Sequence, residues 1–234
     1  AAETIDGAAS YTSTHNAQTV TVWVDNAITL DAKRGTYTSS ESLTGGPGSS
    51  SMLDYAGMST SVWVNMSGGI VNSVPNASTR TSISGSSYND TISGFEWFHL
   101  GSAGDTFYGS TTAERIEGGS GDDVYQFSTG DGHDVIDDSD GVDTLVFGSG
   151  VQATNVAVTR DGASLVLTVN AQDSIRVNNS AGNNVVDQVK FSDGTIWYAK
   201  ADGSGFNAPL TGGVSIQGQA TQGQTLTLAN TLAD

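Results

Sequence analysis

The chain has 234 residues, of which 36% are apolar and 14% charged, and it contains 30 glycines. It carries 25 acidic and 8 basic side chains, a net charge of −17, so it repels phosphate backbones, and we expect no nucleic-acid partner. The absence of cysteine excludes disulfides and thiolate metal sites. No signal peptide and no apolar run long enough to span a membrane is present, so we expect no membrane insertion by this chain, and export directed by sequence outside it.

Residues 1–84 have the pattern of irregular β-strands. The segments "TVTVWVDN" (19–26) and "STSVWVNM" (59–66) resemble one another, and both alternate as strands do. They are interpreted either as leading coils of a solenoid or as two similar strands of a sandwich. Helical periodicity is nearly absent from the whole chain, and β-branched runs broken by glycine favour an all-β fold.

Residues 85–147 contain a phased repeat. An acidic residue is followed two positions later by an apolar residue, and this pair occurs six times, with the acids separated by 15, 9, 9, 11 and 9 residues. The six acids are Asp90, Asp105, Glu114, Asp123, Asp134 and Asp143. The segment "GGSGDDVYQ" (118–126) fits the nonapeptide G-G-x-G-x-D-x-U-x, with U apolar, at every fixed place. The pattern predicts a parallel β-roll, a solenoid with one turn and one short strand per repeat.

The roll geometry predicts calcium between its turns. Two repeats make one coil, so turns that are two repeats apart stack at about the 4.8 Å spacing of strands, and Asp105 and Asp123 face one gap. A hard dication relieves their repulsion, and calcium takes 6–8 oxygens, whereas magnesium demands a rigid octahedron. Gly118, Gly119 and Gly121 permit the positive φ angles that let turn carbonyls point into the gap.

Further ligands follow from the same phase. Asp143 extends the first row, Glu114 and Asp134 pair on the opposite side, and Asp90 and Asp140 complete the candidate set. Because Glu114 is longer than aspartate and two extra residues around "FSTGDG" must bulge, we expect any missing site to lie beside Glu114. One apolar residue in nine buries too little surface to offset the entropy of ordering, so we expect residues 85–147 to be disordered without calcium.

Residues 148–205 lack the nine-residue period and are richer in apolar residues. "NVAVTRDGASLVLTV" and "DQVKFSDGTIWYA" predict hairpins with turns at Asp161–Gly162 and Asp193–Gly194. Such hairpins are expected to cap the open end of the solenoid. Residues 206–234 have the composition of a linker and then the start of a strand-rich module, so we expect the chain to be part of a longer protein.

The segment "GFEWFHLGSAG" interrupts the repeat with bulky residues. It is interpreted as a local core plug or as an aromatic platform for a sugar ring, for which Trp97 and His99 are the candidate ligand-binding residues. Catalysis is not expected. No G-x-S-x-G motif accompanies the histidines, and the regular phase of the acids is better explained by metal than by glycoside hydrolysis.

These repeats resemble the RTX family, the haemolysin-type calcium-binding proteins, over residues 85–147, and the flanking segments extend the resemblance to roughly 50–205. The resemblance implies a calcium-loaded parallel β-roll and type I secretion from a bacterium. It transfers the ligand role first to Asp105 and Asp123, then to Asp90, Asp134 and Asp143. Glu114 departs from the pattern, as do Ser110 and Thr112 at glycine positions. Residues 206–234 resemble immunoglobulin-like modules of giant bacterial surface proteins.

We therefore expect a monomeric, non-enzymatic calcium-binding module, secreted or at the cell surface, that gives calcium-dependent folding and rigidity to an adhesin or toxin. Two alternatives stay open. One is an adhesion module that binds carbohydrate or protein. The other is part of a secreted polysaccharide-modifying enzyme.

Overall fold

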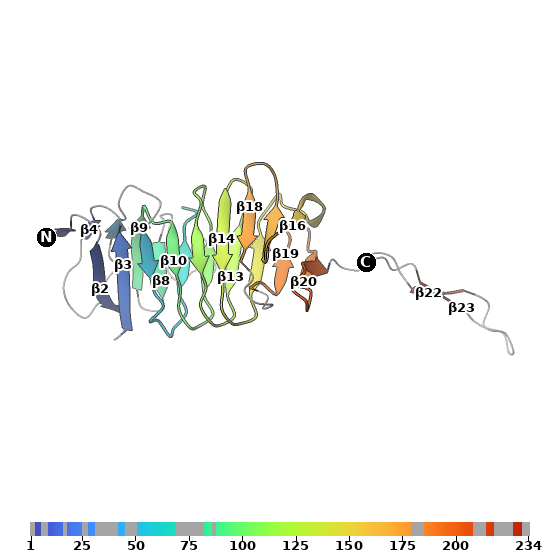
Figure 1. The fold of residues 1–234 in the computed structure, drawn as a ribbon, viewed down its shortest axis with the longest axis horizontal. Helices are drawn as coiled ribbons and strands as arrows, with labels where there is room; N and C mark the ends of the chain where they lie inside the picture. Colours follow the sequence, from blue (N-terminus) through green and yellow to red (C-terminus); the bar gives the residue numbers. More distant parts are fainter. Residues whose placement is uncertain are drawn as a thin grey trace.

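The chain forms an elongated β-solenoid in which short strands stack side by side along the long axis (Figure 1). The computed structural model describes residues 51–68, 91–178 and 185–207 together with Ser84, and outside these ranges only the backbone pairing of further strands. In these ranges the single helical segment is a 3₁₀ turn, η1 (Ala153–Asn155). No helix there is long and apolar enough to cross a membrane.

The first sheet contains twelve strands of the described backbone. In spatial order they are β1 (Glu3–Ile5), β4 (Ile28–Leu30), β5 (Ser42–Thr44), β9 (Tyr88–Ser93), β8 (Ser82–Gly85), β7 (Trp63–Asn65), β11 (Thr106–Tyr108), β13 (Val124–Phe127), β15 (Thr144–Phe147), β19 (Gln188–Lys190), β20 (Ile196–Ala199) and β21 (Phe206–Asn207). From β7 through β11, β13 and β15 to β19 every pairing is parallel, as a β-roll requires.

The second sheet contains nine strands of the described backbone. Their order is β16 (Ala157–Asp161), β17 (Ser164–Thr168), β18 (Ser174–Val177), β14 (His133–Asp137), β12 (Arg115–Glu117), β10 (Trp97–His99), β6 (Met52–Asp54), β3 (Gln18–Val24) and β2 (Ala9–His15). The run β6–β10–β12–β14–β18 is parallel. The strands of the two runs alternate along the chain, so each coil contributes one strand to each sheet.

The core is a seam of apolar residues, one from each short strand. In the first sheet the seam is Val64, Phe107, Tyr125, Leu145 and Val189, and in the second it is Leu53, Phe98, Ile116, Ile136 and Val177. All ten are buried. The apolar residue of each repeat points inward, and its neighbours along the strand point outward, as the alternation of side chains in a strand requires. Rings from the two sheets meet across the core, with the centroids of Phe98 and Phe107 5.1 Å apart.

A two-residue insertion lengthens the coils that follow β12 and β13 relative to the coils that lead into them. Thr106 pairs with Val124, which is two nonapeptides further along the chain. The next pairings, Val124 with Thr144 and Arg115 with Val135, each span two residues more than that. The extra residues form a tight turn at 128–131, between β13 of the first sheet and β14 of the second, in which the Asp131 carboxylate accepts the Ser128 N–H at 2.6 Å. The expected bulge in "FSTGDG" is confirmed, and it leaves the ladder in register.

Antiparallel strands end the parallel stack at its C-terminal side. β16 and β17 form the predicted hairpin, with Asp161 paired to Ser164, and β17 also pairs antiparallel with β18. β19 and β20 form the second predicted hairpin. Strands β22 (Val214–Gln217) and β23 (Thr227–Asn230) pair only with each other in the described backbone. Most of residues 206–234, the segment that resembles an immunoglobulin-like module, lies outside the described residues.

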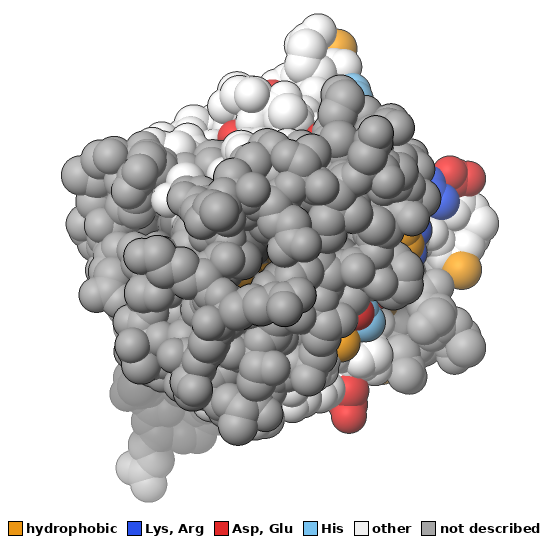
Figure 2. Space-filling view, turned by 90° about the vertical axis from the view of Figure 1, so that its left-hand side faces the viewer, with side chains coloured by type: hydrophobic (Ala, Val, Ile, Leu, Met, Phe, Trp, Pro, Cys, Tyr) orange, Lys and Arg blue, Asp and Glu red, His pale blue; other side chains and the backbone are white. Residues whose placement is uncertain are grey.

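At the other end, parallel pairing already includes β6 and β7, so Trp63 lies in a solenoid coil. β3, which carries Trp23, is instead an antiparallel neighbour of β6 in the other sheet. Figure 2 looks along the solenoid from this end, and the described side chains at its rim include acidic, basic and histidine groups.

Candidate metal centre

Four aspartates form a ladder along one edge of the roll, where the turns lead into the first sheet. Each carboxylate accepts a backbone N–H from the coil before it: Val62 to Asp105 at 2.7 Å, Asp105 to Asp123 at 2.6 Å, Asp123 to Asp143 at 2.9 Å, and Asp143 to Asp187 at 2.9 Å. Asp105, Asp123 and Asp143 are each only 1% exposed. The predicted row of Asp105, Asp123 and Asp143 therefore lies in one line at the edge of the roll, and Asp187 continues it.

Three carboxylates converge at the centre of this edge. One oxygen from each of Asp123, Asp138 and Asp143 lies within 4.8 Å of the other two. Burial raises the pKa of Asp123 to about 9, and the neighbouring charges of Asp138, Asp105 and Asp143 contribute to the rise. Burial likewise raises the pKa of Asp143 to about 7 and that of Asp138 to about 6. Without a cation, this site opposes ionisation of its own carboxylates.

The stacked turns approach so closely that only glycine fits at several positions, among them Gly121 and Gly141. Gly121 has φ +115°, and a Cβ there would lie 2.6 Å from the carbonyl carbon of Ala103. Gly141 has φ +144°, and a Cβ there would overlap the carbonyl oxygen of Gly121. The backbone oxygen of one turn thus faces the next turn, as predicted for the glycines of the repeat. Carbonyl and carboxylate oxygens are therefore brought together along the same edge.

The opposite edge of the roll is arranged differently. Glu114 is 2% exposed, and its carboxylate accepts hydrogen bonds from the Ser110 N–H at 3.2 Å, from the Ser110 hydroxyl, and from the Thr112 hydroxyl at 2.6 Å. Asp134 accepts the Glu114 N–H through Oδ1 at 2.9 Å, while its Oδ2 is buried without a hydrogen-bond partner. Burial raises the pKa of Asp134 to about 9, and the charge of Glu114 adds to this. Hydroxyl groups of its own turn thus already donate hydrogen bonds to the Glu114 carboxylate.

The donor set fits calcium. The clustered ligand atoms are carboxylate oxygens, with no sulfur, and turn carbonyls lie beside them. Calcium holds oxygens at about 2.3–2.6 Å, so ligand atoms on one ion are separated by at most about twice that distance, and the 4.8 Å cluster satisfies this limit. The orphaned Oδ2 of Asp134 marks a second place where a buried acceptor lacks its partner. Asp123, Asp138 and Asp143 are the side chains that would hold an ion.

Other residues that the sequence singled out contribute no carboxylate to the three-carboxylate cluster. Asp140 is exposed, and its carbonyl oxygen accepts the Gly121 N–H at 3.1 Å. Asp90 lies in β9, and its side chain is outside the described residues. His133 is exposed, with Nδ1 2.9 Å from the Ser174 hydroxyl. Gly119 has φ +102° and Gly121 has φ +115°, as predicted, but the prediction of a positive φ is wrong for Gly118, where the space is taken by the side chains of Tyr125 and Asp138.

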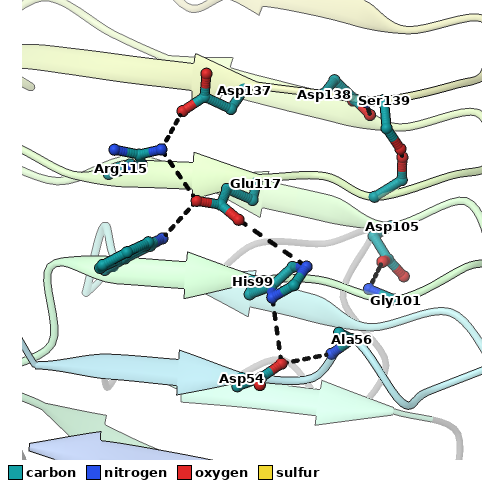
Figure 3. A network of polar contacts seen from close by, with 12 residues as sticks. Asp54, Ala56, His99, Gly101, Asp105, Arg115, Glu117, Asp137, Asp138 and Ser139 are labelled. Carbon is teal, nitrogen blue, oxygen red and sulfur yellow. Dashed lines mark hydrogen bonds and ion pairs between the residues drawn. The ribbon is translucent and has the colours of Figure 1, made fainter.

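Trp97 and His99 belong to a polar network on the outer face of the second sheet (Figure 3). Trp97 Nε1 donates to Glu117 Oε1 at 3.1 Å, and the Arg115 guanidinium lies 4.8 Å from the centre of the indole ring. His99 Nδ1 lies 3.4 Å from Asp54. The neighbouring Phe95 and Phe98 are buried in the core. The aromatic segment is therefore partly core and partly surface: alternate residues of β10 point in opposite directions.

A surface cavity of about 300 Å³ adjoins this network. Its lining residues are His99, Arg115, Glu117, Gly119, Asp137, Asp138 and Ser139. Arg115 bridges two of the acids, with one nitrogen 3.1 Å from Glu117 and 2.8 Å from Asp137. The cavity reaches from the outer face of the sheet to the edge that carries the three-carboxylate cluster, since Asp138 belongs to both.

Sequence reasoning missed Asp173 and Asp187 as members of the two edges. Burial acts to raise the pKa of Asp173, but hydrogen bonds from the Asn170 side chain and from the N–H groups of Gly130 and Gly132 outweigh it and lower the pKa. The signal was present: Asp173-Ser-Ile175 and Asp187-Gln-Val189 both continue the pattern of an acid followed two residues later by a buried apolar residue. The nine-residue period does not identify them, because long hairpin segments separate them from the repeats.

Comparison with known families agrees with the geometry. The RTX calcium-binding nonapeptide repeat (4 copies) matches residues 80–96, 99–125 and 126–151. The haemolysin-type calcium binding protein related domain matches residues 165–201. None of the curated proteins matches the chain. The repeat match covers the turns of the ladder, and the second match covers the hairpin segment that follows them.

Proposed function

Because the chain belongs to the RTX family of calcium-binding repeat proteins, we propose that its role is to fold and stiffen, on binding calcium, a larger secreted or cell-surface bacterial protein. The ion is calcium, as the repeat family implies. The family is typically a structural, non-catalytic module, and RTX repeats are typical of secreted bacterial proteins. An adhesin or toxin as the parent protein, secretion by a type I system and a monomeric state are parts of the same proposal.

The observation that carries the proposal is the convergence of Asp123, Asp138 and Asp143 in stacked turns. The site is assembled from two coils, since Asp123 precedes β13, and Asp138 and Asp143 precede β15. An unfolded chain cannot hold these carboxylates together, so the free energy of binding is available only to the folded state. Calcium therefore stabilises the roll in proportion to its affinity for the complete site.

The remaining ligands of the proposed set extend this site along both edges. Asp105 stacks directly before Asp123, and burial raises its pKa to about 7. Asp134 supplies the orphaned oxygen on the opposite edge. Glu114 is proposed to bind calcium least well, because Ser110 and Thr112 already donate to its carboxylate.

A calcium titration followed by far-ultraviolet circular dichroism tests the proposal. The chain in a chelator is expected to give the spectrum of a largely unfolded polypeptide, and added calcium restores the β-sheet signal with a sharp midpoint. Magnesium at the same concentration is the control and leaves the chain unfolded, because it holds its waters and demands octahedral geometry. A β-sheet spectrum that is the same with chelator and with calcium would contradict the proposal.

A second candidate function, recognition of a carbohydrate, is favoured by the cavity beside His99. Its walls offer three carboxylates, Glu117, Asp137 and Asp138, and the guanidinium of Arg115, groups that suit the hydroxyls of a sugar. A glycan array probed with the calcium-loaded chain, with Trp97→Ala and His99→Ala as comparison variants, tests this. Binding by the parent chain that both variants lose supports a sugar site, and an array without signal excludes it for the glycans present.

A further inference from the structure

Asp138 stands where the repeat has glycine. The Ser120–Asp140 bridge and the pairing of Val124 with Thr144 set the same offset between the two turns. That offset makes Asp138 the counterpart of Gly118, the first glycine of the perfect nonapeptide "GGSGDDVYQ". A large charged side chain thus occupies a position that is glycine in the perfect repeat.

The absent side chain of Gly118 provides the space that this carboxylate fills. A Cβ on Gly118 would overlap both the Tyr125 hydroxyl and Asp138 Oδ2, and would lie 2.6 Å from Asp123 Oδ2. Three oxygens from two successive coils thus surround one glycine Cα. Glycine in the earlier coil and aspartate in the later coil are complementary, and a larger residue at Gly118 would leave no room for the arrangement.

Tyr125 connects the core to the same point. Its ring occupies the inward apolar position of the repeat and is 0% exposed. Its hydroxyl donates a hydrogen bond to Asp138 Oδ2 and lies 3.5 Å from Asp123 Oδ2. A purely apolar residue would satisfy the packing at this position, whereas a buried tyrosine needs a partner for its hydroxyl. Here that partner is the additional carboxylate.

We infer that Asp138 is an additional calcium ligand outside the nonapeptide pattern, and that the Tyr125 hydroxyl is the positioning group that directs it toward Asp123 and Asp143. This inference rests on the proposed calcium function. The ion between the turns of residues 118–123 and 138–143 then has three carboxylates. The ion between the turns of residues 101–105 and 118–123 has the repeat's own ligands alone, because Gly118 offers no side chain at the position that Asp138 occupies in the next coil. Since affinity rises with ligand charge, the three-carboxylate site is the tightest of the roll.

Isothermal titration calorimetry of the whole chain with calcium alone tests this through a matched set of variants. Asp138→Asn is expected to weaken the tightest binding step by at least about tenfold, and Asp138→Gly, which restores the repeat, by about 100-fold. Asp122→Asn removes the same charge from an exposed position of the turn that contains Asp123, and is expected to change that step less than about twofold. At saturating calcium all three variants should recover the parent circular dichroism spectrum, which confirms that they fold.

The positioning role of Tyr125 is tested by a double-mutant cycle. Tyr125→Phe keeps the ring and removes the hydroxyl, and is expected to weaken the same step by about tenfold. In the Asp138→Gly background it should have no further effect, because the group it directs is gone; additive losses would show a merely structural role and overturn the positioning claim. If the parent chain binds calcium and Asp138→Gly binds it equally well, Asp138 is not a ligand. If the parent chain binds no calcium, it is the proposed function that fails.

Discussion

Replacing Asp123 by asparagine should have opposite effects on the metal-free and the calcium-loaded protein. Burial, reinforced by the charges of Asp138, Asp105 and Asp143, raises the pKa of Asp123 from 3.8 to about 9. At pH 7 the unfolded chain releases this proton while the metal-free fold retains it, so the unfolded state is favoured. Asparagine removes that penalty, and its carbonyl oxygen can still accept the Asp105 N–H.

The size of this destabilisation follows from the difference between pH 7 and 3.8, the ordinary pKa of an aspartate. Each unit corresponds to about 1.4 kcal/mol, so Asp123 destabilises the metal-free fold at pH 7 by up to about 4 kcal/mol. Asp123→Asn should therefore stabilise the metal-free fold by up to about 4 kcal/mol. With calcium present it should lower the stability instead, because one charged ligand is lost from the three-carboxylate cluster.

The assay is circular dichroism in chelator, with trimethylamine N-oxide titrated in to fold whichever chain is unfolded. Asp123→Asn should fold at a lower osmolyte concentration than the parent chain, and should need more calcium when the osmolyte is absent. Asp122→Asn is the matched control, since Asp122 is exposed and its side chain accepts the Val142 N–H, as asparagine can. A variant that is harder to fold in chelator than the parent chain would refute the reasoning.

Four further predictions concern the roll as a whole. The stability of the metal-free fold should fall as the pH rises from 3.8 to about 9, because in this range Asp123 and Asp134 are ionised in the unfolded chain but still protonated in the fold. For the same reason calcium binding at pH 7 should release protons, which calorimetry in different buffers detects. Gly121→Ala should cost about 1–3 kcal/mol from backbone strain alone, measured by urea denaturation in calcium. Phe107→Ala should cost about 3–5 kcal/mol in the same assay. Ser110→Gly, Thr112→Gly and Glu114→Asp combined should add one calcium ion to the calorimetric stoichiometry.

Each of these predictions has its own control or contradicting result. Gly162→Ala, at φ +65° with open space around it, separates the strain of the backbone from the clash expected at Gly121. An equal loss of unfolding free energy in Gly121→Ala and Gly162→Ala would show that the stacked turns are not in contact at Gly121. A metal-free fold whose stability rises with pH would count against the first prediction. A loss of less than about 1 kcal/mol in Phe107→Ala would count against the third. An unchanged calcium stoichiometry in the triple variant would count against the fourth.

Much of the fold was predictable because the repeat has a regular period. The inward positions of Ile116, Tyr125 and Ile136 follow from the phase of the acids, and all three are buried. The two hairpins followed from Asp161–Gly162 and Asp193–Gly194 between alternating strands. What the period could not predict was the start of the parallel ladder at β6 and β7, since a long intervening segment separates β7 from its parallel partner β11 and leaves no repeat to detect.

The candidate site was predicted in part. Asp105, Asp123 and Asp143 fall in one ladder because their spacing equals whole coils, which any stacked repeat preserves. Asp138 was not distinguishable from its acidic neighbours, because its role depends on the space above Gly118 in another coil. Asp140 was selected in its place, and its side chain is exposed. Sequence spacing identifies which turns stack, whereas the direction of a side chain within a turn depends on contacts between coils.

Hydrogen exchange resolved to single amides, with calcium and with chelator, tests the central claim most directly. The amides of Asp105, Asp123 and Asp143, each of which donates to the aspartate of the next coil, report on the stacking of the turns. Calcium-dependent folding predicts strong protection of all three with calcium and exchange near the rate of an unfolded chain in chelator. Equal protection in the two conditions would show that the roll remains folded without calcium, and would contradict the account.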